Sequence, residues 1–444
     1  MYETVNEKRL IDRLTLHLMP LLGLLYLMAY IDRQNVSYAK LQMIDSLHMS
    51  EVSYGLGASL FFIGYLLFEV PSNMALYRVG APRWLARIML TWGAVTLMLA
   101  FTRNAPMFYV LRFLLGAAEA GLYPGIIYYM TLWFPARHRA RIMGYFVLGS
   151  AVGNMSGAAI CGALLDLQGL WGLHGWQWVF IATGLPPIAL AFVTCFLLPA
   201  GPAAARFLSH DERAWLAREL KKDAAGYPAH GPVLKVLVDR RVLLLSGYFM
   251  MVSMSIAAVS YWMPTLVKGF GVSNTANGLL GTIPWLIVTA ILMWLPKRMG
   301  SGTKLLKGIA IAASIGAVAF VFSALFPANA WRFAALCVAA PCMYIIVPCF
   351  WTLPAEFLSG ARAAAGIAAI NSIGNMGGFL AQNLAPWIRN QTGSAAAPML
   401  MPAVCLFIVL GGTLLMLARR GRDSTDAMPA GSSAPTARTG GIAH

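Results

Sequence analysis

Residues 150–157 read Ser-Ala-Val-Gly-Asn-Met-Ser-Gly, and residues 372–378 read Ser-Ile-Gly-Asn-Met-Gly-Gly. Both stretches lie within long apolar runs, about 220 residues apart. A second pair of similar segments, residues 77–80 (Tyr-Arg-Val-Gly) and 297–300 (Lys-Arg-Met-Gly), has nearly the same separation. Two matches in one register indicate that the second half of the chain repeats the first. Parallel repeats of this kind are typical of membrane carriers, which bind substrate between the halves.

The composition agrees with a membrane protein. Of 444 residues, 59% are hydrophobic and 11% are charged, and the mean hydropathy is +0.67, which excludes an ordinary soluble domain. The net charge of +16 would suggest a nucleic-acid partner in a soluble protein. Here membrane topology explains it, so no nucleic-acid partner is expected. The six cysteines fall in apolar runs without CxxC or metal-ligand spacing, so neither a metal site nor a cofactor is expected.

Twelve apolar segments are long enough to cross a bilayer, which takes roughly 20 residues each. They predict an all-α membrane protein of two six-helix bundles. The segments are residues 14–31, 52–76, 84–102, 106–133, 141–165, 176–198, 242–266, 275–296, 305–326, 331–354, 363–385 and 397–418.

Arginine and lysine are concentrated in alternate loops, beginning with the residues around Lys8 and Arg13 and ending with Arg419 to Arg422. The opposite set of loops has few cations, such as Arg103 and Arg332. The positive-inside rule therefore places both termini in the cytoplasm, and an even number of spans requires the same. We expect a multi-pass protein of a bacterial inner membrane.

These features divide the chain into four parts: a first bundle at 1–198, a linker at 199–241, a second bundle at 242–418, and a disordered cytoplasmic tail at 419–444. In the linker, Ser209 and Glu212 have the spacing of a capping box, followed by apolar residues on one face of a short helix. This helix either tethers the bundles or couples their movements, and the sequence leaves both readings open.

Charged residues within the membrane are costly, so each requires a reason. Arg112 and Glu119 lie two helical turns apart on one face of the span 106–133. They either face a central cavity or contact each other inside the bundle. Asp32 and Arg33 follow the first apolar run, so they lie either outside the membrane or, if the helix continues, on the cavity wall. In addition, Tyr123-Pro124-Gly125 is expected to break its span just past the middle.

The residue types predict anion binding. The guanidinium groups of Arg33 and Arg112 suit a carboxylate, because they offer planar, permanently charged donors. Asp32 and Glu119 are the candidate proton-coupling sites. Further residues that could contact the rest of a ligand are Tyr65, Trp351, Thr352, Asn371 and Asn375.

Several motifs taken together resemble the anion:cation symporter family of the major facilitator superfamily. The resemblance covers nearly the whole chain. Its motifs are Asp32-Arg33-x-Asn35, Phe68-Glu69-Val70-Pro71-Ser72-Asn73, Arg78-x-Gly80-Ala81-x-Arg83-Trp84, Arg112-Phe113 through Glu119-Ala120-Gly121-x-x-Pro124-Gly125, and Trp133-Phe134-Pro135.

The resemblance implies proton-coupled import of a small carboxylate, such as tartrate, phthalate or a sugar acid, by alternating access. It also implies that Asp32 and Glu119 carry protons, that Arg33 and Arg112 take part in carboxylate binding, and that Tyr65 and Asn371 contact hydroxyl groups. Ser150 stands where sugar-acid carriers can have Gln, which leaves a smaller or aromatic carboxylate more open. We expect a monomer that uses the proton gradient and lies in contact with lipid.

The alternative is a proton-driven efflux antiporter for drugs or metabolites, which favours an acidic cavity over an arginine-lined one. An enzyme is not expected, since the sequence has no HExxH, P-loop or G-x-S-x-G motif. A channel is disfavoured because twelve spans in two repeats suit a carrier better.

Overall fold

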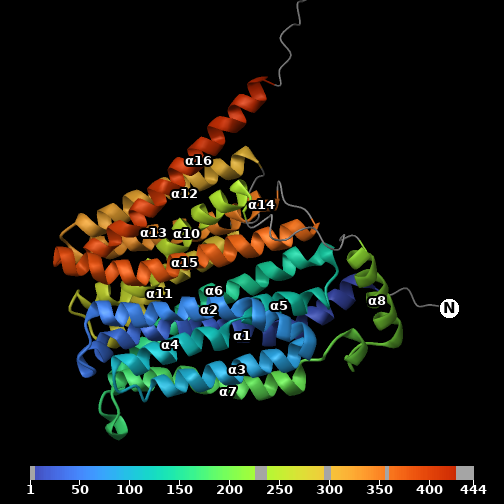
Figure 1. Ribbon diagram of the computed structural model, residues 1–444, viewed down its shortest axis with the longest axis horizontal. Coiled ribbons are helices and arrows are strands. Elements are labelled where there is room, and N and C mark those ends of the chain that lie inside the picture. The colour runs from blue at the N-terminus through green and yellow to red at the C-terminus, as the bar shows by residue number, and fades with distance from the viewer. Residues whose placement is uncertain (1–5, 226–237, 295–301, 356–359, 427–444) are drawn as a thin grey trace, which may run out of the picture.

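The structure is a computed structural model that describes residues 6–225, 238–294, 302–355 and 360–426. In these ranges all regular elements are helices, and most run side by side along one direction (Figure 1). The predicted all-α class is therefore confirmed for the described residues.

The helices of the first repeat pack chiefly on one another: α3 on α7, α2 on α4 and α1 on α6. Their bounds are α1 Glu7–Ser46, α2 Glu51–Val79, α3 Ala81–Leu99, α4 Ala105–Glu119, α5 Leu122–Thr131, α6 Ala136–Leu164 and α7 Gly175–Leu197, with short 3-10 turns at Leu165–Leu167, Leu170–Gly172 and Pro202–Ala204.

The helices of the second repeat form a similar group, in which α10 packs on α15 and α12 packs on α13 and α16. Their bounds are α10 Arg240–Lys268, α11 Asn274–Trp294, α12 Thr303–Leu325, α13 Asn329–Phe350, α14 Thr352–Ala355, α15 Gly360–Thr392 and α16 Leu400–Asp426, with a 3-10 turn at Ala397–Met399. The last helix thus continues beyond residue 418, where the tail was predicted to begin. Residues 427–444 of that tail lie outside the described residues.

Ten helical segments in the described ranges are long and apolar enough to cross a membrane, counting α4 and α5 as one. The predicted spans 84–102 and 363–385 are present as α3 and α15, but neither is among these ten. Large apolar side chains such as Leu67, Leu286, Val318 and Phe196 are more than half exposed on the outside of the molecule. An exposed apolar surface of this kind suits contact with lipid.

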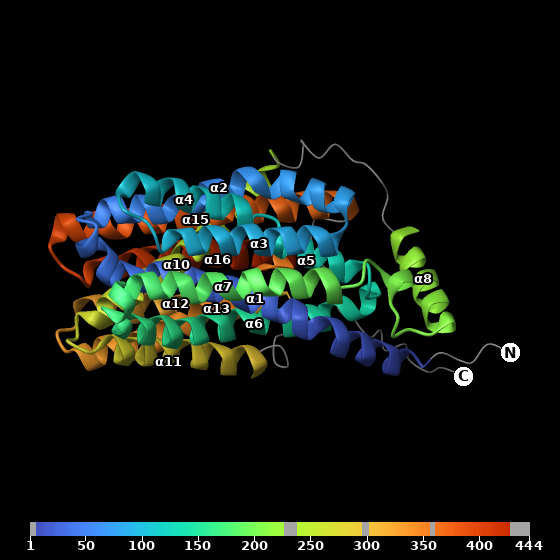
Figure 2. The same cartoon turned by 90° about the horizontal axis from the view of Figure 1, so that it is seen from below.

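The two ends of the helix array differ. The start of α1 and the linker helix α8 (His210–Ala225) lie at one end, here called the linker end (Figure 2). The opposite end, here called the far end, carries the turn between α1 and α2 (residues 47–50) and the segment between α6 and α7 (residues 165–174).

Helix α1 does not end at Asp32, and it continues to Ser46. Several of its polar side chains have hydrogen-bond partners on neighbouring helices or on α1 itself, which lowers the cost of keeping them within the bundle. Gln34 donates to the amide oxygen of Asn154 at 2.7 Å, and Asn35 donates to Asp32 at 2.8 Å and to Thr183 at 3.1 Å. Of the two alternatives left open by the sequence, the structure has the one in which the helix continues and Asp32 and Arg33 lie within the bundle.

The break in the predicted span 106–133 falls earlier than Pro124. Helix α4 ends at Glu119, and Gly121 takes a φ of +91°, a left-handed conformation that favours glycine. A Cβ on Gly121 would also lie 2.4 Å from the hydroxyl oxygen of Ser72. Pro124 instead stands in the first turn of α5, where the missing N–H costs little. The break at Gly121 leaves Glu119 as the last residue of α4.

The predicted capping box is confirmed at the start of α8. The backbone N–H of Glu212 donates to the hydroxyl of Ser209 at 3.2 Å, and the backbone N–H of Ser209 donates to the Glu212 carboxylate at 2.9 Å. Glu212 also accepts from Arg13 of α1 at 3.0 Å, so the cap is joined to the first repeat. Leu216 is fully buried beneath the helix.

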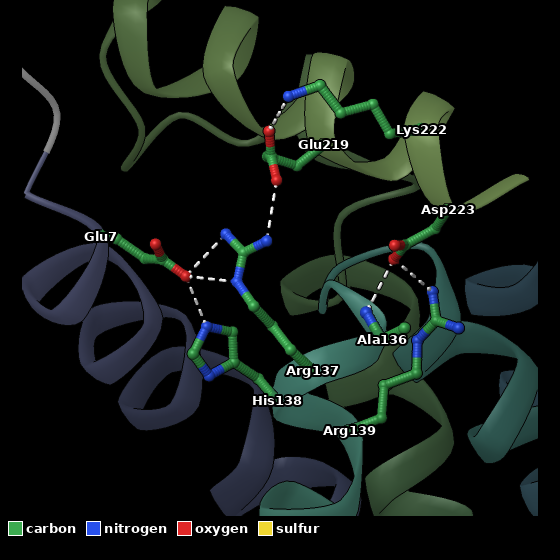
Figure 3. Close-up of polar contacts among 8 residues, drawn as sticks. All are labelled: Glu7, Ala136, Arg137, His138, Arg139, Glu219, Lys222 and Asp223. Atoms are coloured by element: carbon green, nitrogen blue, oxygen red, sulfur yellow. Dashed lines mark hydrogen bonds and ion pairs between the residues drawn. The ribbon is translucent and has the colours of Figure 1, made fainter.

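Contacts of Glu219 and Asp223 fasten α8 to α6, and Arg137 extends this network to α1 (Figure 3). Arg137 bridges Glu7 at 2.7 Å and Glu219 at 2.8 Å, so one guanidinium joins all three helices. Asp223 accepts from the backbone N–H of Ala136 at 2.7 Å and pairs with Arg139, at 3.4 Å. The linker helix is thus docked on the first repeat.

Replacing Arg137 with Gln removes the cation shared by Glu7 and Glu219. We expect amide hydrogen exchange across α8 to become about two- to fivefold faster, as for the loss of exposed ion pairs. Arg218→Gln is the control, because the exposed Arg218 donates only within α8, to the carbonyl of Ala214. Equal exchange in the two variants would show that these ion pairs do not hold the helix.

The docking should also weaken in acid. Hydrogen bonds from Lys222 and then from Arg137 hold the pKa of Glu219 below its ordinary value of 4.5. A carboxyl with a lowered pKa stabilises the folded arrangement above its ordinary pKa, and this contribution is lost as the pH falls through the lowered value. The protection of α8 against exchange should therefore decrease below pH 4.5.

Candidate functional site

The two repeats meet most closely toward the far end. The contacting pairs are α6 with α11, α2 with α15, and α1 with α10 (Figure 1). Glycines permit the closest approach: a Cβ on Gly162 of α6 would lie 2.5 Å from the Cα of Gly278 of α11. Backbones this close leave no room for a solute between these two helices.

Polar contacts join the two repeats at the same end. Lys40 is buried and pairs with Glu51 at 2.6 Å, and Glu51 also pairs with Arg389 of α15. The ammonium of Lys40 lies 3.7 Å from the centre of the Trp262 ring in α10, a cation–π contact between repeats. We call Lys40, Glu51, Arg389 and Trp262 the far-end cluster.

Asp166 adds a second connection at the far end. Its carboxylate accepts from the amide of Asn274 at 2.8 Å and from the hydroxyl of Thr275 at 2.5 Å, both at the start of α11. Asp166 therefore connects the first repeat to the start of α11 in the second. With the far-end cluster, this contact closes the far end.

A cavity lies about half-way along α2 and α15, between the repeats. Its volume is about 30 Å³, which is room for only a few water molecules. The lining residues are Arg33, Phe61, Phe62, Tyr65, Leu66, Glu69, Ser372, Asn375 and Met376. A larger solute therefore requires the walls to separate.

Arg33 and Glu119 form an ion pair beside this cavity. The Arg33 guanidinium lies 3.4 Å from one carboxylate oxygen of Glu119. The Arg33 side chain is 41% exposed, whereas that of Glu119 is 2% exposed. The second oxygen of Glu119 is buried and has no hydrogen-bond partner. The pair therefore offers a half-exposed cation backed by a buried acid.

The other two predicted charges lie inside the first repeat. Asp32 is buried and accepts from Thr96 at 2.9 Å. Arg112 is also buried, donates to the carbonyl of Ala58 at 3.0 Å, and lies 5.0 Å from the Phe61 ring centre. Neither lines the cavity, and Glu119 pairs with Arg33 rather than with Arg112 on its own helix.

The cavity includes two of the five predicted contact residues, Tyr65 and Asn375. Asn371 lies one turn from Asn375 on α15 but is not in the lining. Trp351 packs against the Phe249 ring at 4.9 Å, and the Thr352 hydroxyl donates to the carbonyl of Cys349. In this arrangement, Trp351 and Thr352 serve packing and the end of α13.

Glu69 and Ser372 line the cavity, although sequence reasoning assigned them no binding role. The position of Glu69 toward the end of the predicted span 52–76 favours an ion pair with a cytoplasmic arginine or a part in an outer gate. The signal was nevertheless present in the spacing: Glu69 lies one turn after Tyr65, and Ser372 one turn before Asn375, each on the same helix face. In the described part of the chain, no group of three His, Cys, Asp or Glu could hold a metal ion.

Comparison with known proteins decides the family. Residues 22–382 match the Major Facilitator Superfamily. The chain belongs to this superfamily. It is 41% identical to a quinolone resistance transporter of Acinetobacter baumannii, covering 94% of this chain and 97% of that protein. It is 38% identical to a putative tartrate transporter of Agrobacterium vitis, covering 92% and 95% of the two chains.

Solved structures agree on the fold of this major facilitator. A bacterial homologue of the human lysosomal transporter Spinster, in an inward-facing and occupied conformation, matches with a TM-score of 0.67 at 17% identity. The match covers 90% of this chain and 96% of that one. The chain is therefore a membrane transporter rather than an enzyme, as its sequence predicted.

The far-end cluster should control how this major facilitator opens. Replacing Lys40 with Met removes both the ion pair to Glu51 and the cation–π contact. We expect a longer-distance population between spin labels at positions 48 and 391, on the two repeats, measured by double electron–electron resonance in a cysteine-free background.

The matched control is Arg332→Met. Arg332 is also at the far end, but its guanidinium donates to the carbonyl of Phe326, within the second repeat. This change should leave the distances unaltered. If Lys40→Met gives the same distances as the unsubstituted protein, the cluster does not stabilise the closed far end.

Proposed function

We propose that the protein imports a small organic carboxylate with protons by alternating access. In this proposal the chain crosses a bacterial inner membrane twelve times, with α3 and α15 among the spans. Both termini and α8 lie in the cytoplasm, and the far end faces the periplasm. The cationic loop residues at the linker end, including Arg13, Arg137 and Arg139, support this orientation under the positive-inside rule.

The ion pair between Arg33 and Glu119 carries the proposal. A carboxylate entering the cavity competes with Glu119 for the guanidinium, whose planar donors fit either partner. Protonation of Glu119 removes its negative charge and frees Arg33 for the substrate. A substrate carboxylate and a proton therefore bind together, because leaving Glu119 charged beside a second carboxylate would be costly.

The other predicted residues act around this pair. Arg112 and Asp32 lie behind the cavity, so we assign Arg112 to support of the α2–α4 packing and Asp32 to proton exchange within the first repeat. Tyr65 and Asn375 contact the remainder of the ligand, and Asn371, Trp351 and Thr352 join them only when the helices move. The relatives named as tartrate transporters support a small carboxylate as substrate.

Alternating access requires two conformations, and the structure with its closed far end represents one of them. In this conformation the substrate has access from the linker end, and the reverse conformation requires the far-end cluster to separate. Alternating access needs both states to lie within a few kcal/mol of each other. A small number of ion pairs and glycine contacts suits this requirement, because few interactions have to break when the far end opens.

The proton link can be tested with Glu119→Gln in proteoliposomes. We expect tartrate uptake driven by an inward proton gradient to fall by about 5- to 150-fold, the usual range of a coupling free energy. Exchange of external for internal tartrate at equal pH should change little, because Gln keeps the shape but carries no proton.

The control is Glu219→Gln, which neutralises an acid on α8 far from the cavity and should transport normally. Gradient-driven uptake that survives in Glu119→Gln would contradict proton coupling through this residue. Loss of exchange and uptake together would indicate a defect in binding or folding, which a thermal unfolding scan with and without tartrate separates.

A second candidate function is proton-driven efflux. The 41% identical quinolone resistance transporter favours it, as does the acidic Glu69 in the cavity. The same liposomes distinguish the two directions. Proton-driven efflux predicts that a quinolone moves in the direction opposite to proton flow, and that this movement is insensitive to Arg33→Gln. Carboxylate import predicts the opposite on both counts.

A further inference from the structure

Glu69 is the second acid in the cavity, and it lies between the two repeats. Its side chain extends from the middle of α2 toward α15, where the hydroxyl of Ser372 donates to its carboxylate at 3.2 Å. The neighbouring residues Leu67, Phe68 and Val70 are exposed on the outside of α2. Glu69 is therefore the residue of this turn that faces the cavity.

The carboxylate of Glu69 has no cationic partner in the described part of the chain. The one arginine in the cavity lining, Arg33, is paired with Glu119 instead. The hydroxyl of Ser372 gives this carboxylate a hydrogen bond but no opposite charge, and a charge in a lipid-enclosed site is costly unless it is paired. The cavity thus holds an acid that the described residues leave without a cationic partner.

The lining has two poles of opposite character. Arg33 of α1 presents a cation, and Glu69 of α2 with Ser372 of α15 presents hydrogen-bond acceptors. A simple anion would satisfy only the first pole. A second carboxylate on the same ligand would be repelled by Glu69, because like charges in a site of low dielectric constant cost several times more than in water.

We propose that Glu69 determines specificity by binding a protonated amine, so that the preferred substrates are carboxylates that also carry an ammonium group. The ligand carboxylate takes Arg33, and its ammonium takes Glu69. This inference rests on the proposed function in one respect, namely that Arg33 receives the carboxylate. It restricts that function: zwitterions are preferred to plain organic anions, and dicarboxylates such as tartrate bind more weakly than either.

Binding to Glu69 would also connect substrate to the movement of the repeats. The hydrogen bond from Ser372 crosses from α15 to α2, and the cavity of about 30 Å³ is too small for such a ligand unless these helices separate. The ammonium then replaces the Ser372 hydroxyl as the partner of Glu69. A substrate without a donor leaves the carboxylate unpartnered when the walls move apart.

A series of six acids with four to six carbons tests the proposal. The probes are 4-aminobutanoate, 4-hydroxybutanoate, pentanoate and glutarate, which share one flexible chain and differ in the terminal group. 5-Aminopentanoate and hexanoate form a second pair with an amine and a methyl end, one carbon longer than 4-aminobutanoate and pentanoate. Their dissociation constants for the full-length protein in detergent are measured by isothermal titration calorimetry at pH 7.

The unsubstituted protein should bind each amino acid of the series about tenfold or more tightly than its methyl counterpart, as one charge-assisted contact provides. Glutarate should bind more weakly than pentanoate. In Glu69→Gln the amine preference should fall to about threefold or less, and glutarate should bind more tightly than before. Glu219→Gln, as a matched neutralisation outside the cavity, should keep the original order.

Ser372→Ala provides a second variant should Glu69→Gln fail to fold. It removes the competing hydroxyl and keeps the carboxylate, so the amine preference should persist or increase. Equal affinities for the amine and methyl acids, an absence of binding by both amino acids, or an amine preference unchanged in Glu69→Gln would each overturn the proposal. If Arg33→Gln binds all six acids normally, the carboxylate site of the proposed function fails instead, which is a separate outcome.

Discussion

Arg33 and Glu119 form an ion pair within a bundle whose outer surface is apolar, and the rest of the site depends on how that pair is accommodated. Removing Arg33 would leave the carboxylate of Glu119, which is 2% exposed, without its charged partner, and an uncompensated buried charge is destabilising. The break after Glu119 at Gly121 and the continuation of α1 past Arg33 bring the two residues together. The local distortion of α4 is therefore part of the site.

The same constraint explains why the buried polar residues of α1 are joined to other helices. Asp32, Gln34 and Asn35 each have partners on α3, α6 or α7 or on α1 itself. Within lipid there is no water to replace these partners, so losing one of these hydrogen bonds would be costly. The network fixes the rotation of α1 and hence directs Arg33 to the cavity.

Local patterns predicted the helices better than they predicted the site. Apolar runs marked the helical segments, and Ser209 with Glu212 marked the start of α8, because both signals depend only on nearby residues. The continuation of α1 depended on Thr96, Asn154 and Thr183, which are distant in sequence. Sequence spacing alone could not reveal such partners.

The position of Glu69 was missed for a related reason. Its closeness to the end of the predicted span 52–76 suggested a contact with residues at the membrane surface. Helix α2 extends to Val79, so Glu69 lies farther from the end of the helix than expected. For Arg112, the position on the helix face was not enough to predict its contacts. It shares a face with Glu119, but its guanidinium contacts the Ala58 carbonyl and the Phe61 ring on α2. Which group a long side chain reaches depends on packing between helices.

The duplicated Gly-Asn-Met element shows how the two repeats have diverged. Asn154 of α6 is buried and bonds to Gln34, so the first copy serves packing, whereas Asn375 of α15 lines the cavity. The charged residues that are buried in the described ranges, namely Asp32, Lys40, Arg112 and Glu119, all belong to the first repeat. The second repeat lines the cavity with Ser372, Asn375 and Met376, which carry no charge.

This division has a mechanical consequence. A charge that moves through lipid loses favourable interactions, whereas a neutral hydrogen-bonding surface can slide with a smaller loss. Keeping the ionised groups on one repeat allows their mutual distances to stay constant while the other repeat moves. The contacts that must break at the far end are then few, and they involve Lys40, Glu51 and Arg389 at the rim rather than Arg33 and Glu119 at the centre.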